Sequence, residues 1–91
     1  MTKAQQLSIL KKDLQQMTSA NDEYLEYLLE QAKAAIEGEG IFVIQDDIRC
    51  EMAVIQYAAY LFRQRAGTET EMPRFLRYEL NNLLFSQKGR C

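Results

Sequence analysis

The chain has 91 residues, of which 47% are hydrophobic and 26% charged, with a formal net charge of −2 at pH 7. This length suits one domain with a modest hydrophobic core, and the small net charge excludes a protein that coats polyanions. No apolar run reaches the roughly 18 residues that a membrane span needs. The first residues are spaced as on an amphipathic helix and do not form a signal peptide. We expect a single cytoplasmic domain over residues 1–91, without contact with a membrane.

The residues that most often carry chemistry are scarce. The chain has no histidine and only two cysteines, Cys50 and Cys91, with no CxxC pair. Cys50 lies in an apolar helical pattern, which is typical of a small core residue. The sequence contains no glycine-rich phosphate loop, no nucleophile elbow and no calcium loop. We therefore predict no enzyme activity, no cofactor and no metal site.

Two helices are expected in the first half of the chain. A helix over residues 3–17 would bury one leucine-rich side and take Thr2 as its N-cap. A second helix over 22–37 would place its core side chains on one face and its acids on the other. The core face comprises Leu25, Leu28, Leu29, Ala32 and Ile36, and the acidic face comprises Glu26, Glu30 and Glu37. An acidic helix face of this kind is usually exposed to solvent, and we favour this interpretation. The alternative is that these acids form a contact surface for a basic neighbour.

The glycines after the second helix end it and lead into a β-branched and aromatic run, IFVI, at 41–44. No second strand candidate exists, so we expect an extended connector over 41–45. Asp46 or Asp47 would then cap a third helix over 47–66. That helix is apolar on nearly all sides, which predicts a central position with neighbours on most sides.

The last helix, expected over 73–87, has two apolar stripes where a surface helix needs one. Pro73 suits its first turn, and the residues 86–91 are expected to form a basic, mobile tail. At about 100° per residue, one stripe comprises Leu76, Leu80, Leu83 and Leu84, and the opposite one comprises Phe75, Tyr78 and Phe85, with Asn82 among them. A helix that is apolar on two sides must be covered twice. The second cover is either more of this chain or another protein.

Charge divides the chain into an acidic and a basic half. Residues 1–51 have five basic and ten acidic side chains, net −5, and residues 52–91 have six basic and three acidic, net +3. This imbalance is common by chance, but it also suits head-to-tail contact between copies. A second interpretation is a small helical regulator that binds nucleic acid through the basic C-terminal third. The linker GTETEM and the isoelectric point of about 5.1 argue against it, and we favour arginines that pair with acids on the same or a neighbouring chain.

Two stretches resemble the head–tail connector proteins of long-tailed phages and prophages. They are AVIQYAAYLFRQRAG at 53–67 and MPRFLRYELNNLLFSQKG at 72–89, and the segment 21–41, a helix that ends in glycine before "GI", also fits the family. The most specific parts are YAAYLFRQR at 57–65 and PRFLRYELNNLLF at 73–85. The resemblance covers most of the chain from about residue 21 onward.

The resemblance implies a small, all-α structural adaptor at the head–tail junction of a virion, assembled in the cytoplasm of the bacterial host. Copies would form a ring, dodecameric to match the portal, that extends the DNA channel without reading the DNA sequence. The ring would dock the next head-completion or tail protein. Gly67 and Pro73 would flank a hinge. The contact with a neighbouring subunit or the portal would use Phe75, Tyr78, Asn82 and Phe85, with Arg74 and Arg77 beside them.

Overall fold

The computed structural model describes residues 2–14, 22–44, 47–65, 67 and 71–88. Within these residues the regular structure consists of four helices and contains no strand. The helices are α1 (Lys3–Asp13), α2 (Asp22–Gly38), α3 (Ile48–Arg65) and α4 (Arg74–Lys88). The small all-α bundle that the sequence predicts is therefore confirmed.

Helix α1 starts at a capping box and ends earlier than the sequence predicts. Thr2 is its N-cap, and the hydroxyl of Thr2 accepts the N–H of Gln5 while the Gln5 side chain accepts the N–H of Thr2, which forms a capping box. The helix ends at Asp13 rather than at the expected Met17, and Leu14 is the C-cap. Helical periodicity identifies the face that is buried but not the residue at which the helix stops. The expected residues 15–17 lie outside the described part of the chain.

The later helices start close to the predicted residues. The Oδ1 atom of Asp47 accepts the N–H of Arg49 at 3.0 Å, so Asp47 is the N-cap of α3. The carbonyl oxygen of Pro73 accepts the N–H groups of Leu76 and Arg77, both at 3.1 Å, and Pro73 therefore precedes α4 rather than forming its first residue. At the end of α2, Gly40 has φ +91°, a left-handed conformation that glycine adopts without steric cost.

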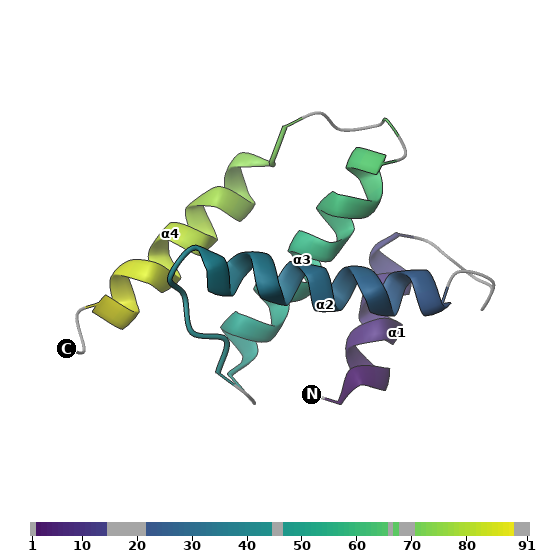
Figure 1. Ribbon diagram of the computed structural model, residues 1–91, viewed down its shortest axis with the longest axis horizontal. Coiled ribbons are helices and arrows are strands. Elements are labelled where there is room, and N and C mark those ends of the chain that lie inside the picture. The colour runs from purple at the N-terminus through teal and green to yellow at the C-terminus, as the bar shows by residue number, and fades with distance from the viewer. Residues whose placement is uncertain (1, 15–21, 45–46, 66, 68–70, 89–91) are drawn as a thin grey trace.

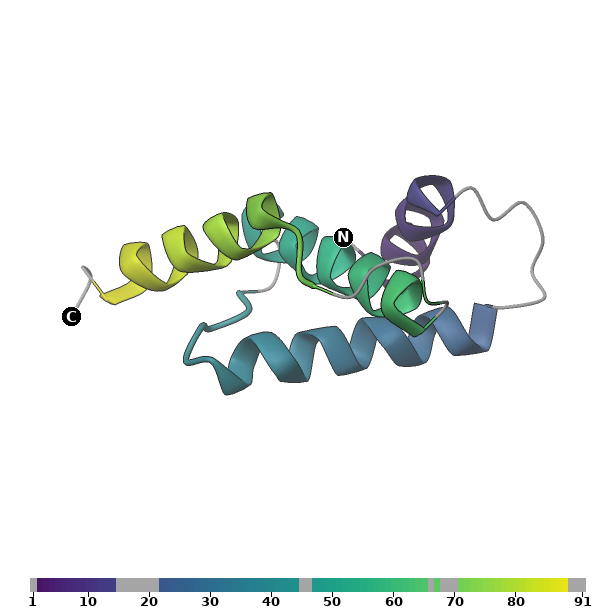
Figure 2. The same cartoon turned by 90° about the horizontal axis from the view of Figure 1, so that it is seen from above.

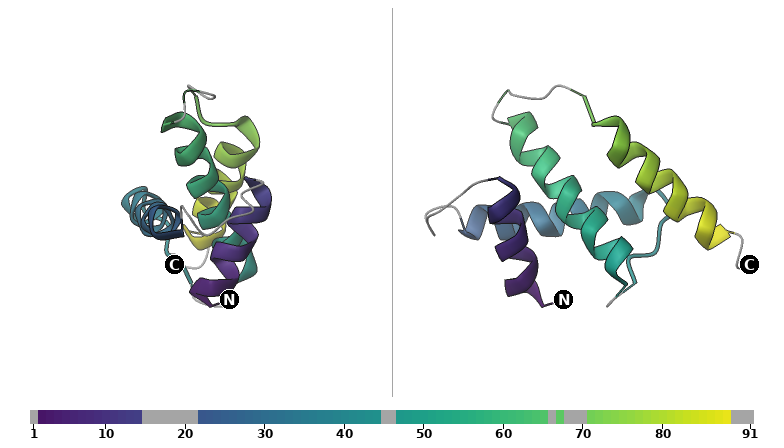
Figure 3. Two further views of the ribbon diagram at one scale, coloured as in Figure 1. Left: turned by 90° about the vertical axis from the view of Figure 1, so that its right-hand side faces the viewer. Right: turned by 180° about the vertical axis from the view of Figure 1, so that it is seen from behind.

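Helix α3 is the centre of the bundle and packs against each of the other helices. Helix α2 crosses it on one side and forms a separate layer, while α1, α3 and α4 form the other (Figure 2). Helices α3 and α4 run antiparallel and side by side (Figures 1 and 3). The Cα trace measures 43 × 29 × 18 Å, and its shortest axis is the view direction of Figure 1.

Every helix contributes to one continuous core. Its largest fully buried side chains are Leu10, Leu25, Leu28, Ile36, Ile55, Leu76, Leu80 and Cys50. Alanines on α3, namely Ala53, Ala58 and Ala59, are buried where α3 meets its neighbours and let helix axes approach closely. Cys50 is 2% exposed, which confirms the predicted small core residue.

The connector between α2 and α3 is extended, as expected, and its side chains alternate in burial. Ile41 is buried and Val43 is half-buried, whereas Phe42 and Ile44 are exposed. The Gln87 side chain of α4 holds the peptide groups of Phe42 through two hydrogen bonds: its Oε1 accepts the Phe42 N–H and its Nε2 donates to the Phe42 carbonyl oxygen, both at 2.7 Å. The C-terminal end of α4 is thus attached to the connector as well as to α3.

Candidate docking groove

The two apolar stripes of α4 have opposite environments. The leucine stripe faces α3, and Leu76, Leu80 and Leu83 are at most 3% exposed. The aromatic stripe faces away from the core. The exposed fractions are 61% for Phe75, 70% for Tyr78 and 73% for Phe85. Because large apolar side chains normally contribute to a core, three exposed aromatic rings on one helix mark a surface that can bind another protein.

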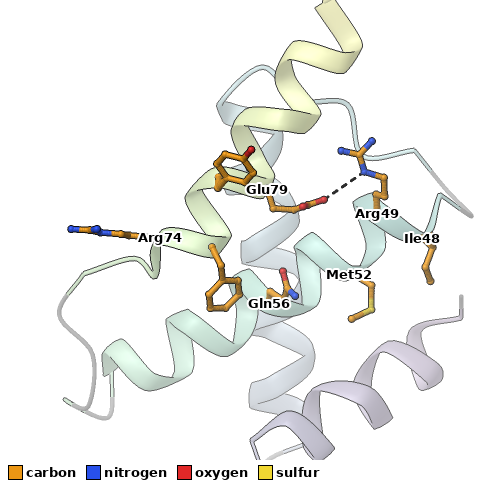
Figure 4. A pocket seen from close by; sticks show the side chains of 8 residues that line it. Ile48, Arg49, Met52, Gln56, Arg74 and Glu79 are labelled. Atoms are coloured by element: carbon orange, nitrogen blue, oxygen red, sulfur yellow. Dashed lines mark ion pairs between the residues drawn. The ribbon is translucent and has the colours of Figure 1, made fainter.

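An open groove of about 710 Å³ lies between α3 and α4 beside this aromatic stripe. Its lining comprises Ile48, Arg49, Met52 and Gln56 from α3 and Arg74, Phe75, Tyr78 and Glu79 from α4. The lining thus combines four apolar side chains with four polar or charged ones. In Figure 4, Arg49 and Glu79 approach each other across the groove and Arg74 extends outward from the start of α4. An apolar surface with a charged rim is typical of protein-binding sites.

The rim of the groove contains a bridge between the two helices. The Arg49 guanidinium on α3 lies 3.5 Å from the Glu79 carboxylate on α4, and the Arg49 side chain is half exposed. Such a surface pair contributes little to stability but restricts the side chains that border the groove. A second, smaller hollow of about 340 Å³ adjoins the groove on the far side of α4. Its lining comprises Met72, Arg74, Arg77, Tyr78 and Asn81.

The structure separates the residues that the sequence grouped as one interface. Phe75, Tyr78 and Arg74 line the groove, whereas Phe85 lies one to two turns beyond it on the same helix. Asn82 is half-buried rather than fully exposed with the aromatic rings. Arg77 faces the connector and lines only the smaller hollow.

Arg77 is held within the chain by the carboxylate of Glu39. Its two terminal nitrogens lie 2.6 and 3.4 Å from the two Glu39 oxygens, a bidentate pair. Its hydrogen bond with Glu39 raises the pKa of Arg77 above its ordinary value. Glu39 also contributes, after burial, to raising the pKa of Tyr57 nearby. The guanidinium of Arg77 is thus committed to an intramolecular contact.

Four groove residues on α3 were not expected from the sequence. Ile48, in the first turn of a helix that the sequence predicts to be apolar on nearly all sides and central, is 59% exposed. Arg49, Met52 and Gln56 follow at helical spacing on the same side. In the sequence, Arg49, Gln56 and Arg63 recur at seven-residue intervals, and this polar strip was the available signal for this side of α3.

The other surfaces named from the sequence are described in part. Glu26, Glu30 and Glu37 are all exposed on the outer face of α2. Gly67 has φ +81°, and its N–H bonds to the carbonyl oxygen of Gln64. The proposed hinge between Gly67 and Pro73 includes residues 68–70, which lie outside the described part of the chain. The predicted tail at 86–91 begins inside α4, which continues to Lys88, and its last residues also lie outside.

Three arginines of the basic third are engaged by other residues of the chain. Arg63 lies 3.3 Å from the Asp13 carboxylate, and Arg77 pairs with Glu39. Arg65 lies over the ring of Tyr24, 5.9 Å from its centroid, and donates to the Gln31 side chain. These arginines contact other residues of the same chain. Their guanidinium N–H donors, which a contact with nucleic acid would need, are therefore already engaged.

The described residues contain no group of three or more metal-ligating side chains. The one buried charged residue among them, Glu51, accepts a hydrogen bond from Gln6 of α1 at 3.5 Å, and joins α1 to α3. In the part of the chain that the structure describes, no helix is both long and apolar enough to cross a bilayer. The exposed aromatic and basic side chains, which the packed helices hold in place, are suited to binding another molecule.

Comparisons of the chain with models of protein families, with curated proteins and with solved structures find no match. The geometry of α3 and α4, together with the residues of the sequence, is therefore the basis for inferring function.

Proposed function

We propose that this protein is a structural assembly protein, a head–tail connector that binds the portal of a filled phage head as a ring. The observation that carries the proposal is the two-sided α4. It buries its leucines against α3 and exposes Phe75, Tyr78 and Phe85 by 61–73%. The resemblance of 53–67 and 72–89 to connector proteins supplies the biological setting.

The exposed rings represent a substantial unused driving force. A phenylalanine or tyrosine side chain can bury about 150–250 Å². Burial of apolar area contributes about 25 cal/mol per Å². Three rings that are each more than half exposed could therefore contribute several kilocalories per mole to association, before its entropic cost is counted. A subunit or portal surface that covers them would recover this energy.

The aromatic face is also presented in a fixed position. The leucine stripe anchors α4 along α3, the Gln87 side chain holds the connector at one end, and Arg77 holds Glu39 beside it. Binding to such a surface requires little additional ordering of the chain, which favours affinity. This suits an adaptor whose role is to present one surface repeatedly around a ring. The ring would extend the DNA channel and dock the next head-completion or tail protein, at the head–tail junction of the virion.

The proposal is tested by binding to portal-containing heads from the corresponding phage or prophage. We expect the wild-type protein to co-sediment with filled heads and to appear as a ring at the portal vertex by electron microscopy. The double substitution Phe75→Ala, Phe85→Ala should abolish binding while the circular dichroism spectrum stays helical. Phe42→Ala is the matched control, because Phe42 is 74% exposed but lines neither hollow.

Two results would count against the proposal. If the wild-type protein bound neither heads nor portal at any concentration, the connector function would be wrong. If the double variant unfolded, the aromatic face would belong to the core of the fold, and the docking role of α4 would have to be abandoned.

A further inference from the structure

The outer face of α2 combines acids with one exposed aromatic ring. Tyr27 is 44% exposed and is the only large apolar side chain of α2 with that exposure. Glu23 precedes it by four residues and Glu30 follows it by three, so helical geometry places both beside the ring. Glu26 and Glu37 are also exposed on this helix, against the single exposed cation Lys33. The face therefore presents an aromatic ring flanked by two acids, while Gln31, which donates to the Tyr27 hydroxyl and accepts from Arg65, lies beside it as well.

The groove between α3 and α4 has the complementary character. Its apolar members, Ile48, Met52, Phe75 and Tyr78, can surround an inserted ring. Arg74 at its edge is exposed and has no ion pair with another described residue, so its charge is available. Arg49 lies on the opposite edge, where its guanidinium contacts Glu79. Positive groups at the rim would attract the acids that flank Tyr27.

The two surfaces lie on opposite sides of the molecule. Helix α2 forms one layer (Figure 2); it packs against α3, and its leucines are buried. In the view into the groove, α2 passes behind α3 (Figure 4). A chain cannot place its own α2 face in its own groove, but one copy can use both surfaces at once with two neighbours. Such a contact is heterologous, and it closes a ring when the rotation between copies allows.

We propose that the α3–α4 groove binds the α2 face of a second copy, with Tyr27 against the aromatic side chains of α4 and Arg74 facing Glu26. The inference rests on the proposed function, because it assigns the subunit contact of the connector ring. From the exposed fractions, Tyr27, Ile48, Phe75 and Tyr78 would remove roughly 450 Å² of side-chain surface from water. This is about a third of the area of a small stable interface, so a single contact is weak and ring closure strengthens it.

Two full-length variants separate the surfaces. The α2-face variant carries Tyr27→Ala and Glu26→Gln, and the groove variant carries Phe75→Ala and Arg74→Gln. All four positions are exposed, and circular dichroism verifies that both variants remain folded. Association is measured by sedimentation velocity up to about 1 mM, because weak protein contacts reach millimolar dissociation constants. Phe42→Ala is the control and should associate like the wild type.

We expect each variant alone to associate at least about tenfold more weakly than the wild type, since each lacks one of two required surfaces. An equimolar mixture should form a 1:1 complex that grows no further, because each variant contributes its one intact surface. In this mixture, nuclear magnetic resonance of the labelled α2-face variant should show shifts at the groove residues Ile48, Met52, Phe75 and Tyr78.

Three results would overturn the inference. The α2-face variant could associate as strongly as the wild type, which would mean that groove meets groove. The mixture could contain no 1:1 complex, which would mean that other surfaces join the copies. The wild type could stay monomeric throughout, which would mean that the paired surfaces do not recognise each other. In each case, binding of the wild type to portal-containing heads is a separate measurement. The connector function can therefore be confirmed when this subunit contact is wrong, and it can be wrong when this contact is confirmed.

Discussion

Helices α3 and α4 both carry apolar side chains on two sides, yet the chain covers α3 almost completely and α4 on one side only. Eight residues of α3 are buried, and of its large apolar side chains only Ile48 is strongly exposed. Helix α4 buries its leucines to the same degree and leaves its aromatic rings in water. The difference lies in position: α3 has a helix on each of three sides, whereas α4 lies at the edge of its layer.

This comparison shows that an amphipathic pattern records how many surfaces a helix must contact, but not which molecule provides them. In α3 most of the apolar side chains are covered by the other helices, and Ile48 at its start is the exception. In α4 one contact is missing, and the aromatic composition of the missing side matches that of interfaces more closely than that of a solvated helix face. Substitutions at four positions test this comparison and the contacts that hold α4 in place.

The largest effect is expected from the buried stripe of α4. Leu80 is fully buried against α3, so Leu80→Ala should lower the free energy of unfolding by about 2–5 kcal/mol. Phe75→Ala, on the exposed stripe of the same helix, should change it by less than about 0.5 kcal/mol. Urea unfolding followed by circular dichroism measures both. Equal losses for the two variants would contradict the division of α4 into a core face and a free face.

A smaller effect is expected where α4 meets the connector. Gln87→Ala removes both hydrogen bonds to the Phe42 peptide groups and should cost about 1 kcal/mol, because water can replace part of what is lost. Gln87→Glu keeps an acceptor for the Phe42 N–H but places a second acceptor against the Phe42 carbonyl oxygen. We therefore expect this variant to be no more stable than Gln87→Ala. Hydrogen exchange at the Phe42 amide provides the local measurement. An unchanged exchange rate in Gln87→Ala would show that α3 alone holds α4.

The smallest effect is expected from Tyr57, which lies beside Glu39 and Arg77 where α3, α4 and the connector meet. Burial, then the Glu39 carboxylate and Tyr60, raise the pKa of Tyr57 above the ordinary value of 10.0, while Arg77 opposes the shift. The folded state therefore holds this proton more tightly than the unfolded state. Stability that is complete below pH 10.0 should decline above it, as the pH rises through the raised pKa of the folded state.

Tyr57→Phe removes the titrating group and should flatten this alkaline decline. Urea unfolding of both proteins at pH 8 and above pH 10 measures the difference, and the other tyrosines serve as an internal background common to both. A decline of equal steepness in the variant would show that Tyr57 does not contribute to it.

Local pattern was sufficient for most of the fold. The period of Leu25, Leu28 and Ile36 identified α2 and its buried side, and the two stripes of α4 were correctly placed on opposite faces. The capping role of Thr2 followed from side-chain chemistry, which also limited the cap of α3 to Asp46 or Asp47, and the structure selects Asp47. These features depend on neighbours within one or two helical turns.

Features that depend on distant residues were not predictable. Gln87 and Phe42 are 45 residues apart, and no local pattern relates an amide side chain to a peptide group at that distance. The groove exists because the first turn of α3 extends beside α4, which placed Ile48 at a surface rather than in the core. The 3.0 Å contact of Lys11, near the end of α1, with Asp22 at the start of α2 likewise depends on how two separate helices pack.

Cys50 makes the connector observable by thiol chemistry. Its Sγ atom is buried at the start of α3 and lies 3.6 Å from the Phe42 carbonyl oxygen, beneath the segment that Gln87 holds. A maleimide or disulfide reagent can reach this thiol only when the connector leaves the helix, since alkylation requires access to the sulfur. In a Cys91→Ser background, the rate at which Cys50 is modified therefore reports how often the connector opens. A partner that binds over this end of α4 would slow the modification of Cys50 without contacting the cysteine.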